Sequence, residues 1–135
     1  MDKISRYFKS ILNGEFLEEE MLIEFCEEFS LKNSEKTFKN LNRIFELCRN
    51  NEEIIPYLES VLSFLSRTGD TDLSLIHLVR FLENSVDAEK NVKALVEQKN
   101  RMKLIGKIFA ESIYFSDILI KIPDYYFLFY DRYYG

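Results

Sequence analysis

The sequence contains little of what interrupts or cross-links a chain: its 135 residues include 4 glycines, 2 prolines, 2 cysteines, 1 histidine and no tryptophan. So few turn-forming residues exclude a fold of many short elements and favour long ones. Two cysteines exclude a disulfide scaffold, and one histidine excludes a histidine cluster. Asp117, Lys121 and Asp124 interrupt the most apolar segment, which is shorter than the roughly 20 residues of a membrane helix. We therefore predict no membrane span.

The length and thiol pattern favour one cytoplasmic domain. At this size roughly two-thirds of the unfolded surface can be buried, so a sizeable core is available and no disulfide or metal ion is needed to stabilise it. Cys26 and Cys48 both fall in apolar helical stripes, and no charged-then-apolar signal segment opens the chain. We expect both thiols to be reduced and buried.

The net charge of -5 argues against nucleic acid as a partner, because a polyanion usually requires a basic face. The charges are unevenly distributed. Residues 15–28 carry seven glutamates and no Lys or Arg, whereas residues 89–107 carry six basic residues against two glutamates. These patches are either solvated helix faces or surfaces that meet a partner protein. The candidate contacts in the basic segment are Lys99, Arg101, Lys103 and Lys107.

Apolar residues recur with helical spacing along nearly the whole chain. The stripes cover residues 4–12, 17–29, 38–48, 54–65, 75–82, 92–96, 104–109 and 115–122. The spacing predicts an all-α fold, an irregular bundle of about seven to nine antiparallel helices. Strands are the alternative for the β-branched residues near 118–122 and the aromatic tail, but no hairpin partner lies nearby.

Capping residues and prolines set the expected helix boundaries. Asp2, Ser34 and Asp87 are candidate N-caps, and the second helix is expected to end near Leu31. Residues 98–100 are expected to be a connection. The chain should form a single domain over 1–135, with a possible seam near 67–71 at a glycine stop followed by a cap.

Two prolines fit the first turns of helices. Pro56 is acceptable if it lies in the first turn of the fourth helix, where its missing N–H is not needed. Pro123 disfavours helical geometry at the preceding residue, so one helix should end there and another begin with Pro123.

No catalytic residues can be assigned from the sequence. Asp70 and Asp72 form an Asp-x-Asp pair, but they stand at a helix entrance and not after a strand, which favours capping over metal binding. His77 lacks an identifiable partner for base catalysis and is expected to be a packed or partly exposed helix residue. The tail tyrosines are interleaved with aspartates, which favours core packing or docking over stacking on nucleotide bases.

Two segments carry a resemblance to a known family. They are DLSLIHLVRFLE, at residues 72–83, and LIGKIFAESIYFSDILIKIPDYYFLF, at residues 104–129. Together they resemble the helical region of glutamine synthetase adenylyltransferase. The residues that match its packing motif are Ser112, Phe115, Leu119, Pro123 and Asp124.

The resemblance implies a non-catalytic, N-terminal helical part of a larger protein that acts in nitrogen-metabolism control. The family usually has His where this chain has Ile122, and its Gly-Ser turn with an Asp-x-Asp strand is absent here. Because adenylyl transfer needs metal clamping of the nucleotide phosphates, we expect no enzyme activity and no cofactor in this chain. ATP and magnesium would belong to the family's catalytic domain. The implied partners are that missing domain and glutamine synthetase or a signalling protein; the alternative is an independent helical protein-protein interaction module.

Overall fold

The computed structural model describes residues 3–15 and 17–133, and these form nine α-helices, a 3-10 turn and no strand. The all-α prediction is therefore confirmed. The helices are α1 (Lys3–Leu12), α2 (Glu19–Glu28), α3 (Ser34–Leu47), α4 (Ile55–Leu65), α5 (Thr71–Glu83), α6 (Ala88–Glu97), α7 (Lys99–Glu111), α8 (Ile113–Lys121) and α9 (Pro123–Tyr133), with the 3-10 turn η1 (Glu52–Ile54) before α4. None of these described helices is long and apolar enough to cross a membrane.

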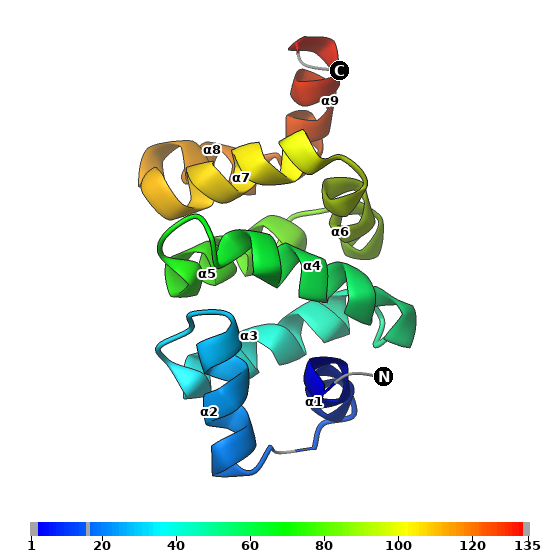
Figure 1. The fold of residues 1–135 in the computed structure, drawn as a ribbon. Coiled ribbons are helices and arrows are strands. Elements are labelled where there is room, and N and C mark those ends of the chain that lie inside the picture. The colour runs from blue at the N-terminus through cyan, green and yellow to red at the C-terminus, as the bar shows by residue number, and fades with distance from the viewer. Residues whose placement is uncertain (1–2, 16, 134–135) are drawn as a thin grey trace.

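The helices are stacked in the order of the sequence (Figure 1). α1, α2 and α3 form one end, α4 and α5 form the middle, α6, α7 and α8 follow, and α9 projects from the far end. Contacts follow the same order, since α3 packs on α5, α4 on α6, α5 on α7, and α8 on both α5 and α7. The two ends of the stack are therefore built from the two ends of the chain.

One continuous apolar core runs through the stack. At the α1–α2 end, Phe8 and Phe25 pack edge to face with ring centroids 5.0 Å apart. At the other end, Phe81 packs in the same way on Phe109 at 5.8 Å and on Tyr126 at 6.5 Å. Edge-to-face pairs satisfy the ring quadrupoles and add to the burial energy. The core continues across the turn at 67–71.

Several predicted boundaries are confirmed. The Asp70 carboxylate accepts a hydrogen bond from the Leu73 N–H at 3.0 Å, and the Asp87 carboxylate accepts one from the Lys90 N–H at 3.1 Å. Gly69 precedes the first of these caps with φ at +127°, a conformation that glycine adopts without strain. Pro56 lies in the first turn of α4, and Pro123 is the first residue of α9.

Three boundaries differ from the prediction. Asn33 caps α3 in place of Ser34, because its side-chain oxygen accepts the Lys36 N–H at 3.0 Å. α2 ends at Glu28, where Ser30 turns left-handed (φ 56°) and the Leu31 N–H returns to the Cys26 carbonyl at 2.8 Å. The connection at 98–100 shrinks to one extended residue, since α7 already begins at 99. The proposed cap Asp2 lies outside the described residues.

Candidate interaction surface

Two serines fix the joint between α7 and α8. Ser112 is extended, and its hydroxyl accepts the Phe115 N–H at 3.1 Å, so it caps α8. The buried Ser116 donates its hydroxyl proton to the Ile108 carbonyl at 3.1 Å, in the last turn of α7. One serine therefore starts α8 and the other ties it back to α7, which fixes the direction of α8.

Two asparagines fix the joint between α8 and α9. The Asn84 side chain, at the end of α5, donates to the Ile120 carbonyl at 2.8 Å. The Asn91 side chain, in α6, donates to the Asp124 carboxylate at 3.2 Å. Ile122 between them is not helical (φ −139°, ψ 69°), as expected for the residue before Pro123. The end of α8 is thus held by α5, and the start of α9 is held by α6.

Arg101 anchors the rest of α9. Its guanidinium donates to the Ala94 carbonyl of α6 at 2.8 Å and to the Asp131 carboxylate of α9 at 2.7 Å. It also lies over the rings of Phe127 and Tyr130, at 5.2 and 5.4 Å from their centroids. α9 is therefore packed in place although it projects from the stack.

Tyr126 adds a second anchor for α9. Its hydroxyl donates to the Arg101 carbonyl at 2.6 Å, and the side chain is almost fully buried. Burial raises the pKa of this phenol. The tyrosine therefore stays protonated and keeps its role as a donor at ordinary pH.

Helices α8 and α9 expose many large apolar side chains. Of the eleven large hydrophobic side chains that are exposed in the described residues, eight lie between 113 and 129. We call this surface the α8–α9 face; its members are Ile113, Tyr114, Phe115, Ile118, Ile122, Tyr125, Leu128 and Phe129. Tyr114 is 71% exposed and Leu128 is 69% exposed. Apolar groups gathered in this way mark an interaction site more often than single exposed ones do.

The stripe predicted for residues 115–122 faces away from the core. Phe115, Ile118 and Ile122 are exposed, whereas Ser116 and Ile120 face the core and Leu119 packs at its edge. The spacing was right, but a stripe does not tell which side is covered. The buried serine escaped sequence reasoning, because a serine in the core is recognised only once its acceptor is known.

The residues of the family resemblance lie together at these joints. Ser112 caps α8, Pro123 begins α9 and Asp124 accepts from α6, while Phe115 is exposed on the α8–α9 face and Leu119 is half-buried. They lie at the α7–α8 and α8–α9 joints and along α8 between them.

The basic segment divides into two parts. Lys99, Lys103 and Lys107 are exposed at successive turns of α7. Arg101, which was expected on the same surface, is only 8% exposed and bonds within the chain. It is a structural residue, because its guanidinium bonds to α6 and to α9.

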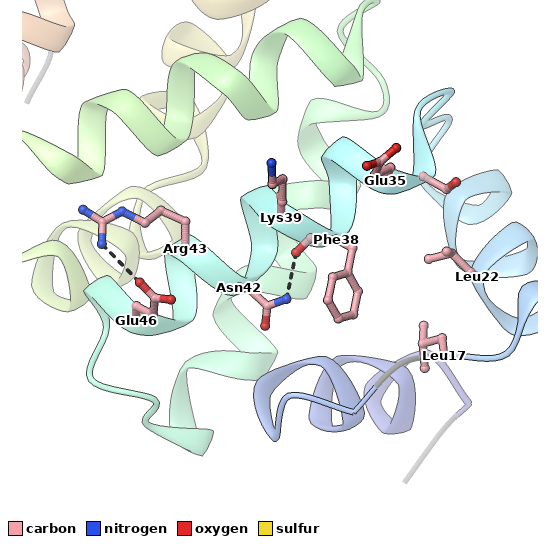
Figure 2. A pocket seen from close by; sticks show the side chains of 9 residues that line it. Leu17, Leu22, Glu35, Phe38, Lys39, Asn42, Arg43 and Glu46 are labelled. Carbon is pink, nitrogen blue, oxygen red and sulfur yellow. Dashed lines mark hydrogen bonds and ion pairs between the residues drawn. The ribbon is translucent and has the colours of Figure 1, made fainter.

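A groove of about 660 Å³ lies at the other end of the stack (Figure 2). Leu17, Leu22 and Phe38 supply its apolar wall, and the charged side chains of α3 surround it. Arg43 is held there by Glu46 at 3.2 Å. The lining also includes Ser34, Glu35 and Lys39.

The acidic end of the stack is mostly solvated. Glu18, Glu19, Glu20, Glu27 and Glu28 are exposed on and beside α2. Glu24 is the exception, since it accepts bonds from Lys3 at 2.6 Å and from the Tyr7 hydroxyl at 3.1 Å. The Lys3 bond lowers the pKa of this carboxyl.

The histidine and the two cysteines, whose side chains could take part in chemistry, are packed in the core. The His77 ring is buried, with Nδ1 2.7 Å from the Phe109 carbonyl, so its ring joins α5 to α7. Cys26 and Cys48 are buried free thiols, and burial raises the pKa of Cys48 to about 12. Throughout residues 3–15 and 17–133 no group of His, Cys, Asp and Glu is arranged to hold a metal ion.

Comparisons of the chain with protein-family models, with curated proteins and with solved structures find no match.

Proposed function

We propose that this chain is a non-catalytic helical interaction domain that binds a partner protein through the α8–α9 face. The observation that carries the proposal is the gathering of eight exposed large apolar side chains on two consecutive helices. From the exposed fractions of its four aromatic members, and with 150–250 Å² for a whole aromatic side chain, their exposed area is on the order of 450 Å², to which the four aliphatic members add. The largest apolar patch of a typical monomer is about 300–600 Å².

The fixed positions of α8 and α9 support the same function. Interface residues bind best when they are held in place before the partner arrives, because less conformational entropy is then lost. The hydrogen bonds of Ser116, Asn84 and Arg101 provide this order for α8 and α9.

Site-specific photo-crosslinking tests the proposal. A benzophenone amino acid is placed at Phe115 and, as the matched control, at Ile23, which is 49% exposed on α2 at the other end of the stack. We expect a discrete protein adduct from position 115 that Ile118→Glu removes, and none from position 23. Equal adducts at both positions, or none at 115, would contradict the proposal.

The resemblance to glutamine synthetase adenylyltransferase offers a specific partner, a nucleotidyltransferase domain. The supporting observation is that Ser112, Pro123 and Asp124 build the joints that present the α8–α9 face. With this partner, the helical chain would position the nucleotidyltransferase domain against glutamine synthetase. ATP and magnesium would bind to the partner.

Two measurements test this partner. The chain alone, mixed with glutamine synthetase, ATP and magnesium, should give no adenylylated product; any product would refute a non-catalytic role. A nucleotidyltransferase domain of the family should co-elute with the chain and lose this association with the Ile118→Glu variant. Failure to co-elute would remove this partner and leave the general interaction function standing.

A further inference from the structure

We infer that the α8–α9 face pairs with the same face of a second copy of this chain, related by a two-fold axis across α8. The inference rests on the proposed function, that the α8–α9 face binds a protein, and it names a second copy as the partner in place of a nucleotidyltransferase domain. A two-fold interface must be self-complementary, so that residue i meets j and j meets i across the axis. The exposed pattern of α8 meets this requirement.

The charged residues of α8 fit a two-fold pairing. Asp117 and Lys121 are exposed one turn apart on the same flank of the apolar stripe, and neither forms an ion pair within the described part of the chain. In an antiparallel pair of helices related by a two-fold axis, like flanks face each other with their directions reversed. With the axis at the level of Leu119, Asp117 of each copy lies opposite Lys121 of the other. The pairing therefore makes two ion pairs from one charge pattern.

The apolar side chains of α8 fit the same register. The same axis places Ile118 close to its own counterpart and Phe115 against Ile122 of the second copy. These three side chains are 43%, 56% and 56% exposed, in that order. They occupy the same stripe at a spacing of three and four residues, which is the spacing that lets two helices interdigitate. One register thus satisfies both the charges and the apolar side chains.

The exposed area of the α8–α9 face supports a dimer. A stable interface of ordinary size buries about 800 Å² on each partner. The four aromatic side chains of the α8–α9 face alone expose an area on the order of 450 Å², and its four aliphatic side chains add to this area. α9 projects beyond the α7–α8 layer (Figure 1). Its Tyr125 and Leu128 are 60% and 69% exposed. The exposed apolar side chains therefore supply a large part of the area that each partner of a dimer buries.

Disulfide trapping of the full chain tests the axis. Ile118→Cys places a thiol next to its counterpart, and the native Cys26 and Cys48 are buried. Under mild oxidation we expect a covalent dimer from Ile118→Cys and much less from Met21→Cys, the control, which is 38% exposed on α2. Equal or no trapping by the two variants would overturn the axis.

Charge exchange tests the register. By sedimentation equilibrium, Asp117→Lys and Lys121→Asp should each weaken dimerisation by roughly tenfold, because two ion pairs become like-charge contacts. The double variant Asp117→Lys/Lys121→Asp should restore the dissociation constant to within about threefold, which would exclude misfolding of the single variants. A double variant as weak as the single ones would overturn the register.

The outcomes separate this inference from the proposed function. A chain that stays monomeric at high concentration, yet gives an adduct with a different protein from position 115, refutes the second copy and keeps the interaction function. A chain that stays monomeric and gives no adduct refutes both. An adduct with twice the mass of the chain, lost with Ile118→Glu, supports both.

Discussion

Replacing Arg101 by alanine should detach α9 from the stack. The Arg101 side chain connects three helices. It belongs to α7 and bonds to the Ala94 carbonyl of α6 and to the Asp131 carboxylate of α9. It also lies between the rings of Phe127 and Tyr130. No other side chain in the basic segment has such a set of contacts among the described residues.

The size of the loss can be worked from these contacts. The part-buried hydrogen bond from a charged donor to the Ala94 carbonyl contributes about 1.5–3 kcal/mol. The ion pair with Asp131 contributes at most about 1 kcal/mol, because that carboxylate is 59% exposed and solvent screens it. Each ring contact adds about 0.5–1 kcal/mol. The buried Nε–H, which has no acceptor among the described residues, offsets about 1 kcal/mol. The net loss is therefore about 3 kcal/mol.

Urea denaturation and hydrogen exchange measure this loss and its location. Arg101→Ala should lower the free energy of unfolding by that amount and raise exchange mainly at residues 123–133. Arg101→Met keeps much of the apolar packing and should cost less. Lys103→Ala is the matched control on the same helix, exposed to solvent, and should change stability by less than about 0.5 kcal/mol. An Arg101→Ala variant as stable as Lys103→Ala would refute the anchoring role.

The remaining predictions concern other joints of the stack. Ser112→Ala removes the N-cap of α8 and should cost about 1 kcal/mol in urea denaturation, whereas no measurable loss would assign the cap no role. Asp72→Ala removes the acceptor of the Lys32 and Asn33 N–H groups and should cost about 1–2 kcal/mol, with faster amide exchange at the start of α3; unchanged exchange there would contradict it. Because burial raises the pKa of Cys48 from 9.0 to about 12, the unfolded thiol loses its proton first, so stability should fall as the pH rises from 9 toward 12. The stability of Cys48→Ala should fall less steeply over this pH range. An identical slope in the two proteins would refute Cys48 as the cause of the fall. Charge reversal of Lys99, Lys103 and Lys107 should leave the melting temperature nearly unchanged while weakening any association with an acidic partner; a large loss of stability would assign these lysines a structural role.

The fold was predictable because its determinants are local. Helical spacing, the caps Asp70 and Asp87, and Pro123 each act within one or two turns of the chain, and the structure follows them. The cap of α3 was misplaced by one residue, because Asn33 and Ser34 are both good caps and the sequence does not rank them.

The candidate surface was only partly predictable, because burial depends on contacts between distant segments. Whether Arg101 is free or buried depends on α9, which lies 30 residues farther along at the Asp131 contact. The same holds for Phe115, whose stripe is visible in the sequence but whose exposure depends on Ser116 facing the Ile108 carbonyl. Sequence patterns predict the apolar stripes of the helices, and tertiary contacts decide which of these stripes stay exposed to solvent.

The two ends of the stack differ in chemistry, and this difference limits how copies of the chain can be joined. One end carries the exposed glutamates of α2, and the other carries the apolar α8–α9 face. A head-to-tail fibre would have to bury apolar side chains against a cluster of carboxylates, which is unfavourable. In the proposed dimer both apolar ends would be buried, and the acidic α2 end of each copy would face outward. Repulsion between these acidic ends would oppose the addition of further copies, so that assembly would stop at the dimer.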